Sequence, residues 1–150
     1  MTQKAPPLII GWREVIQLPS LGLVDVPAKI DTGARTSAIH ASKIRSFERD
    51  GATWVQFSFR HRGASGRSLC EARVIDERLI TNTSGKPEKR YVINTFLQLG
   101  KRKWQIELSL ADRKEMSMPI ILGRTAVRRR NILINAGRSW VTGKPRKDSL

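Results

Sequence analysis

The sequence is poor in features that mark several protein classes. Its 150 residues hold one cysteine, Cys70, which excludes an internal disulfide and is typical of a reducing compartment. No apolar run approaches the roughly 20 residues of a membrane-spanning helix, and residues 1–7 lack the pattern of a signal peptide. We therefore expect a cytoplasmic protein with no membrane segment.

Acidic residues and aromatic residues are also scarce. The chain has 13 Asp and Glu against 28 Lys and Arg, a formal net charge of +15, which favours an acidic partner: nucleic acid, ribosomal surroundings or an acidic peptide. Four Trp, four Phe and one Tyr are present, and several occupy alternating positions typical of a core. Few remain to stack nucleobases, so an acidic peptide is the preferred partner.

The apolar pattern predicts a mostly-β closed barrel in one domain. Residues 53–60 are typical, because Val55, Phe57 and Phe59 alternate with polar residues and would share a buried face. We expect a flexible leader over residues 1–7, the domain over 8–142 and a basic tail over 143–150. Predicted strands cover residues 8–10, 15–18, 23–31, 36–42, 53–60, 69–74, 74–80, 90–99, 104–110, 118–122, 132–134 and 139–141, and one short helix covers 125–131.

The stretch from Leu23 to Asp31 is an apolar-rich strand that runs into Thr32, Gly33 and Ala34. Gly33 permits a tight backbone path that brings amide N–H groups up to the Asp31 carboxylate. The small side chain of Ala34 keeps the wall of the site beside this carboxylate small. One carboxylate cannot both activate water and protonate a leaving group. Such chemistry needs two carboxyls that share a proton.

A second segment, residues 118–124, has a pattern that adds to the meaning of the Asp31 turn. Residues 118–122 are a continuous apolar run, typical of a strand buried on both faces, and Gly123 and Arg124 follow before the predicted helix. Together, in this order, the two segments resemble the paired signatures of retropepsin-like aspartic peptidases. The resemblance runs from about Ile10 to Ile134, and it is closest to the bacterial RimB-like family, labelled ATP-dependent zinc protease and found near RimK-type glutamate ligases.

The resemblance implies a retropepsin-like acid-protease barrel that acts as a homodimer, because 150 residues are too few for a two-lobed single-chain enzyme. Asp31 of each chain would activate a water, Thr32 would hold the two turns together, and the Gly33 N–H would bond Asp31. Residues 81–89 would form the flap over the substrate. The implied substrate-binding residues are Ala34, Arg35, Thr36, Thr83, Ser84, Gly85, Ile121, Gly123 and Arg124, with Leu122 also behind the site.

One departure from the viral pattern concerns charge. Viral enzymes have an acidic residue after the Ala, which pairs with the Arg of the second signature, whereas this chain has Arg35. Arg35 and Arg124 cannot pair with each other. One hypothesis is that both guanidinium groups clamp a carboxylate-rich substrate, and the other is that Asp25, Glu115 or another local acid satisfies them.

The residues give no support to a zinc site or a nucleotide site. His40, His61 and Cys70 match no common zinc spacing, and there is no His-Glu-x-x-His motif. No phosphate-binding glycine-rich loop is present. We expect no metal and no cofactor, and we interpret His40 as a packed or solvated histidine rather than a ligand.

The sequence favours an aspartic endopeptidase-like hydrolase whose substrates are acidic or polyglutamate-tailed, with a functional link to a RimK-type glutamate ligase. The alternative is a non-catalytic basic barrel that binds nucleic acid, ribosome or peptide through residues 101–103, 128–130 and 144–147, although short charge runs are usually solvated surface. A third hypothesis is an inactive retropepsin-like domain that binds peptide without cutting it.

Overall fold

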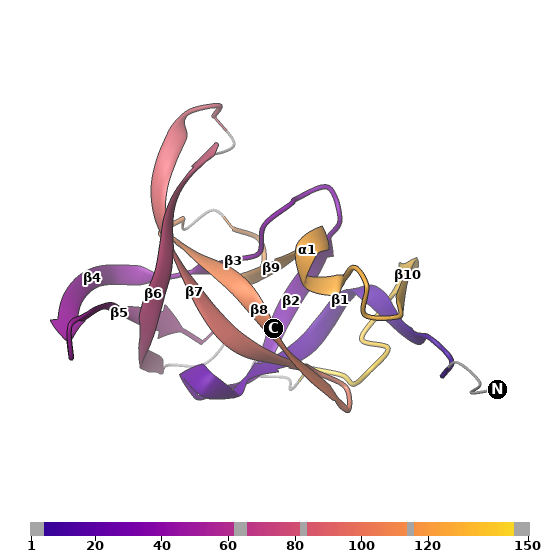
Figure 1. The fold of residues 1–150 in the computed structure, drawn as a ribbon. Helices are drawn as coiled ribbons and strands as arrows, with labels where there is room; N and C mark the ends of the chain where they lie inside the picture. The colour runs from indigo at the N-terminus through magenta and orange to yellow at the C-terminus, as the bar shows by residue number, and fades with distance from the viewer. Residues whose placement is uncertain (1–4, 62–65, 82–83, 114–115, 146–150) are drawn as a thin grey trace.

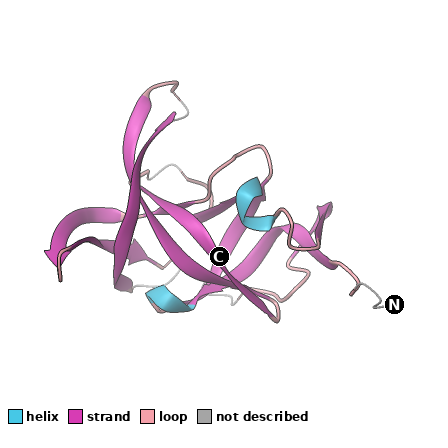
Figure 2. Ribbon diagram, in the orientation of Figure 1, coloured by secondary structure: helices cyan, strands magenta, loops and turns pink. Residues whose placement is uncertain are grey.

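The computed structural model describes residues 5–61, 66–81, 84–113 and 116–145, which form an all-β protein (Figure 1; Figure 2). Two helical turns accompany the strands: η1 (Pro19–Leu21) and α1 (Arg124–Val127). The strands are β1 (Leu8–Leu18), β2 (Leu23–Asp31), β3 (Ala38–His40), β4 (Ser42–Arg49), β5 (Ala52–Arg60), β6 (Arg67–Thr81), β7 (Pro87–Leu99), β8 (Arg102–Ala111), β9 (Ile120–Gly123) and β10 (Ile132–Ser139).

Six strands close into a barrel in the order β1, β2, β9, β3, β8 and β7, and the pairing of β1 with β7 at Gln17 and Gln98 completes the ring. β10 adds to β1 as a parallel edge strand, and β6, β5 and β4 continue from β7 as a wing. Figure 1 shows this wing beside the barrel, with the far ends of β6 and β7 rising from it as an arm. The prediction of a closed all-β barrel with one short helix is confirmed.

The core follows the predicted alternation. Val55, Phe57 and Phe59 are buried on β5, and on β8 the side chains of Ile106 and Leu108 point into the core. Burial of each such side chain contributes roughly 1.5–3 kcal/mol to folding. This alternation is why the short strands of the barrel could be read from sequence.

Ser109 departs from that alternation. We expected Gln105, Glu107 and Ser109 to share the exposed face of β8, and the first two are exposed. Ser109 is only 2% exposed, because β3 pairs with β8 at this point and the Ser109 side chain donates a hydrogen bond to the Ser37 carbonyl. Its burial matters for the site described below.

Several element bounds were wrong. β1 is one continuous strand, with a register irregularity between Gly11 and Arg13, where two short strands were expected. β4 was not predicted at all. β10 is likewise one strand, and residues 140–142 lie beyond it, held to the buried Glu14 carboxylate by hydrogen bonds from Val141 and Thr142.

The predicted helix over residues 125–131 is shorter than expected. α1 ends at Val127, because Arg128 is extended and both Arg129 (φ 63°) and Asn131 (φ 55°) adopt left-handed backbone conformations. A helix cannot continue through those angles. The basic residues after α1 therefore lie on an irregular segment.

The structure describes only part of the predicted leader and part of the predicted tail. β1 begins at Leu8, and residues 143–145 are irregular. Residues 1–4 of the leader and 146–150 of the tail lie outside the described residues. Within the described ranges, no helix has the length and apolarity needed to cross a membrane.

Candidate functional site

The Asp31 turn lies at the end of β2, where β2 pairs in parallel with β9 and Asp31 stands opposite Gly123. The Gly33 N–H donates to Asp31 Oδ1 at 3.1 Å, and the Ala34 N–H donates to the Asp31 carbonyl at 3.1 Å. Asp31 is half-buried, and Thr32 and Gly33 are exposed. The turn thus presents an oriented carboxylate at the surface of a single chain.

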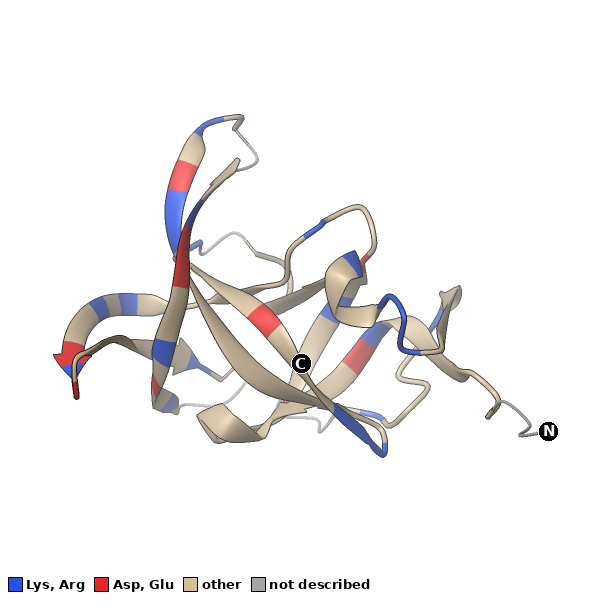
Figure 3. Ribbon diagram, in the orientation of Figure 1, with Lys and Arg blue, Asp and Glu red and all other residues tan. Residues whose placement is uncertain are grey.

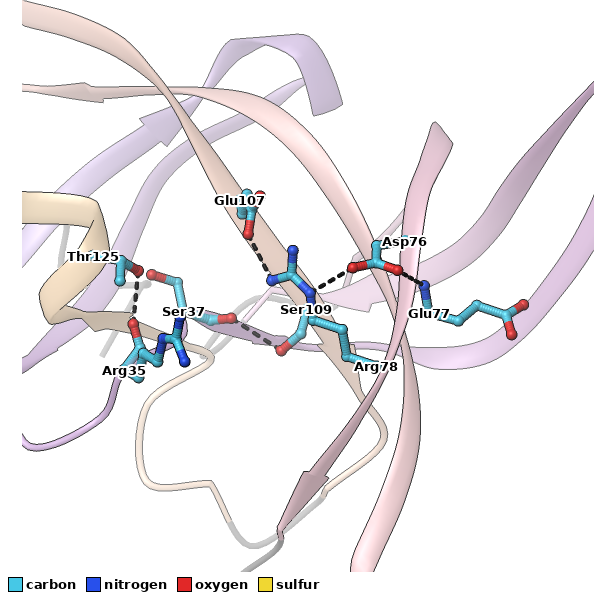
Figure 4. Close-up of polar contacts among 8 residues, drawn as sticks. All are labelled: Arg35, Ser37, Asp76, Glu77, Arg78, Glu107, Ser109 and Thr125. Carbon is cyan, nitrogen blue, oxygen red and sulfur yellow. Dashed lines mark hydrogen bonds and ion pairs between the residues drawn. The ribbon is translucent and has the colours of Figure 1, made fainter.

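Gly123 and Ser37 hold the strand end behind this carboxylate. The Gly123 N–H donates to Ser37 Oγ at 3.0 Å, and a Cβ on Gly123 would lie 2.7 Å from the Thr36 carbonyl carbon and oxygen. The Ser37 carbonyl in turn accepts from the N–H and the hydroxyl of Ser109, each at 3.0 Å (Figure 4). Sequence reasoning missed Ser37 and Ser109, since neither residue type nor spacing marked them.

Among the described residues, the hydrogen bonds of the two arginines at the site involve backbone groups and Thr125, and none involves an acid. Arg124 donates through its backbone N–H to the Ala34 carbonyl at 2.8 Å and through Nη1 to the Gly33 carbonyl at 3.2 Å. The Arg35 carbonyl accepts from Thr125 Oγ1 at 2.7 Å (Figure 4). Within the described ranges, neither guanidinium forms an ion pair.

Of the local acids suggested as partners for these arginines, Asp25 lies against β1. Its Oδ1 accepts from Gln17 Nε2 at 2.8 Å, and its own N–H donates to Gln17 Oε1 at 2.8 Å. Glu115 lies outside the described residues. In the described part of the chain, neither Arg35 nor Arg124 forms an ion pair with Asp25.

A charged network connects β6, at the base of the β6–β7 arm, to β8. Arg78 on β6 donates through Nε to Asp76 and through Nη1 to Glu107 on β8, each at 2.7 Å (Figure 4). The hydrogen bond from Arg78 lowers the pKa of Asp76, and the bonds to Glu107 and Asp76 raise the pKa of Arg78. Arg78, Ser37 and Thr125 are among the residues that line a small hollow of about 10 Å³. Sequence reasoning did not identify this network.

Of the remaining predicted site residues, some lie beside the Asp31 turn and others lie on the distant arm. Leu122 is buried behind the turn, and Ile121 is half-buried where β9 pairs with β2 and β3. Ser84 and Gly85 lie at the tip of the arm, which Figure 1 shows standing apart from α1 and the end of β2. Thr83 lies outside the described residues. The strands β6 and β7 reach Thr81 and Pro87, so the predicted flap loop is shorter than residues 81–89.

The three side chains considered as zinc ligands lie apart and have other contacts. His40 Nδ1 accepts from the Arg113 N–H at 3.0 Å, and His61 Nε2 lies 2.6 Å from Ser68 Oγ. Cys70 is buried, and desolvation raises the pKa of its thiol to about 11. In the described part of the chain, no three His, Cys, Asp or Glu side chains form a group that could hold a metal.

The curated relatives that the chain matches are named probable alpha-L-glutamate ligases. The chain is 40% identical over 152 residues to a probable alpha-L-glutamate ligase of Desulfotalea psychrophila and 40% identical over 139 residues to one of Shewanella pealeana. These matches cover 100% and 91% of this chain but only 32% and 30% of the relatives. The chain therefore spans about a third of the length of the curated relatives it matches.

A solved structure supports the fold. The crystal structure of a Legionella pneumophila protein with unknown function (DUF785) superposes with a TM-score of 0.77 at 26% identity, covering 90% of this chain and 98% of the other. Residues 9–145 match a family model described as "RimB-like: Retropepsin-like aspartic endopeptidase RimB". With the Asp31 turn and the closed barrel, this match shows that the chain belongs to the RimB-like family of retropepsin-like aspartic endopeptidases.

Proposed function

We propose that the protein is a homodimeric aspartic peptidase in which each chain supplies one Asp31. The observation that carries the proposal is the Asp31 turn itself: a carboxylate oriented by the Gly33 N–H, backed by Gly123 and open to the surface. Among the described residues, the Asp31 carboxylate accepts its side-chain hydrogen bond from the Gly33 N–H, and the exposed Thr32 hydroxyl has no hydrogen-bond partner. Both groups are therefore available to a second copy of the turn.

In this proposal the two Asp31 carboxyls share one proton. Like charges about 3 Å apart cannot both ionise readily, so one carboxyl stays protonated while the other accepts a proton from water. The water oxygen attacks the peptide carbonyl carbon and gives a tetrahedral intermediate. The C–N bond then breaks, and the leaving nitrogen takes a proton from the dyad. The titration belongs to the pair rather than to either carboxyl.

We propose that the substrate is an acidic or polyglutamate-tailed peptide. The net charge of +15 favours an acidic partner, and Arg35 and Arg124 place two guanidinium groups on the turn and on α1 without acidic partners among the described residues. The names of the relatives, probable alpha-L-glutamate ligases, add support for a link to a RimK-type ligase that attaches such tails.

A mixing experiment tests the two-chain site. Asp31→Asn keeps the shape of the side chain but cannot complete a carboxyl pair, so a dimer with one Asn is inactive. Titrating wild-type protein with excess Asp31→Asn should reduce hydrolysis of a glutamate-tailed peptide in proportion to the fraction of mixed dimers. Activity that depends only on the amount of wild-type chain would contradict the shared site.

A further inference from the structure

An open cleft of about 480 Å³ lies next to α1 and is lined by Arg102, Lys103, Trp104, Arg129, Arg130 and Asn131. We call it the basic cleft. It has four cationic side chains in its lining and no Asp or Glu, and Lys101 and Arg128 flank it in sequence. Figure 3 shows its two basic segments, the turn between β7 and β8 and the segment after α1.

The cleft is held in shape by contacts between these segments. Arg102 Nη1 donates to the Arg130 carbonyl at 2.7 Å and to the Asn131 carbonyl at 3.2 Å. Trp104 Nε1 donates to the Ala126 carbonyl, the last residue but one of α1, at 2.9 Å. The cations are thus concentrated by the fold and not only by the sequence, where the two segments lie 25 or more residues apart.

Each of the two aromatic rings here has a cation over it, although Phe96 keeps 38% of its surface exposed. The Arg130 guanidinium lies 5.7 Å from the centroid of the Trp104 ring, and Trp104 is only 7% exposed. Lys103 Nζ lies 5.0 Å from the centroid of the Phe96 ring. Nucleobases need free aromatic faces for stacking, whereas carboxylates need only the donors of Arg and Lys. The arrangement favours an acidic peptide over a single-stranded nucleic acid.

The basic cleft is within reach of the Asp31 turn. Gly123 pairs with Asp31, and Arg129 follows Gly123 by six residues, so the Cα atoms of Gly123 and Arg129 lie at most about 22 Å apart. An extended tail of about six glutamates covers the same distance. Arg124 and Arg128 lie along the chain between the two positions.

We infer that the basic cleft is a second binding site, outside the catalytic turn, for the acidic tail of the substrate. This inference rests on the proposed function, because it names where the tail of that substrate is held. The cleft sets a preference for tails long enough to contact both it and the turn. Decaglutamate should therefore bind much more tightly than diglutamate.

The test measures binding without cleavage. Fluorescence anisotropy of labelled decaglutamate is recorded with the full chain carrying Asp31→Asn, alone and with Lys103→Gln and Arg129→Gln added. These two lining residues make no hydrogen bond that holds the cleft, unlike Arg102. The two substitutions together should weaken decaglutamate binding about five- to tenfold, as expected when two charge-assisted contacts are lost.

A matched control removes the same charge elsewhere. Arg60 and Arg73 are exposed on the wing, and Arg60→Gln with Arg73→Gln should change binding less than about twofold. Equal weakening by the two pairs would overturn the inference, because net charge alone would then explain binding. Tighter binding of a ten-nucleotide RNA that displaces decaglutamate would also overturn it, in favour of a nucleic-acid site.

The outcomes separate this inference from the proposed function. Decaglutamate that binds in the basic cleft but is never cut by the wild-type chain supports the second site and contradicts the peptidase. Decaglutamate that is cut equally well with and without Lys103 and Arg129 supports the peptidase and contradicts the second site. Thermal melting of each variant shows whether a loss of binding reflects unfolding.

Discussion

At the scale of single residues, the turn depends on Gly123 as much as on Asp31. Gly123 faces Asp31 across β2 and β9, and backbone atoms of Thr36 and Ala34 occupy the space where a side chain would begin. The clash is with backbone and not with the end of a flexible side chain. Gly123 is therefore required by close approach of the chain, and no left-handed backbone angle is involved.

We predict that Gly123→Ala destabilises the protein by about 1–3 kcal/mol, the usual cost of forcing extra atoms into a packed site. The new Cβ would lie 2.7 Å from the Thr36 carbonyl, so the Asp31 turn must shift. Urea unfolding measures the change. Gly66→Ala is the matched control, since no described residue has an atom within 4 Å of its added Cβ, and a cost as large as that of Gly123→Ala would refute the steric explanation.

Sequence reasoning identified the residues of the turn but not what supports them. Asp31, Gly33 and Gly123 were predicted from two short motifs, and the structure brings all three together. Ser37 and Ser109 were missed because their role depends on the pairing of β3 with β8, which brings together residues 72 apart in sequence. No local pattern carries that information.

At the scale of elements, a buried carboxylate joins β1 to the segment that follows β10. Glu14 is fully buried, and its two oxygens accept hydrogen bonds from the N–H groups of Gly11, Val141 and Thr142 and from the Thr142 hydroxyl. The distances are 2.6–3.1 Å. These contacts fix residues 141–142 beyond the end of β10, and of the predicted strand over 139–141 only Ser139 belongs to a strand.

We predict that Glu14→Gln costs about 1–3 kcal/mol of stability, because the new NH₂ group faces donors and leaves at least one of them unsatisfied. Hydrogen exchange at Val141 and Thr142 should accelerate before that of the barrel strands. Glu48→Gln, on the exposed face of β4, is the control and should have little effect. Unchanged exchange at both amides in Glu14→Gln would contradict this role for Glu14.

Element type was more predictable than element length. Alternating apolar residues gave β5 and β8, since a half-buried strand has a period of two. The length of α1 was not predictable from propensity, because left-handed angles at Arg129 and Asn131 end it where Arg102 bonds the Arg130 and Asn131 carbonyls. A tertiary contact therefore decides the local conformation.

At the scale of the whole molecule, the barrel closes around one core, but a single chain supplies only one of the two carboxyls that the proposed reaction needs. One chain of the described structure offers a single oriented carboxylate, Asp31, at the turn. Positive charge is concentrated nearby by folding, in the basic cleft and at Arg35 and Arg124. We therefore expect both dimerisation and an acidic substrate to be needed for activity.

The central claim is hydrolysis of an acidic tail by the Asp31 pair. The most direct measurement is mass spectrometry of an oligoglutamate-tailed peptide incubated with the wild-type chain and with Asp31→Asn, both in EDTA. The account predicts shortened peptides with the wild-type chain alone. Equal trimming by Asp31→Asn, or no trimming by a wild-type chain shown to be dimeric and to bind the peptide, would contradict it.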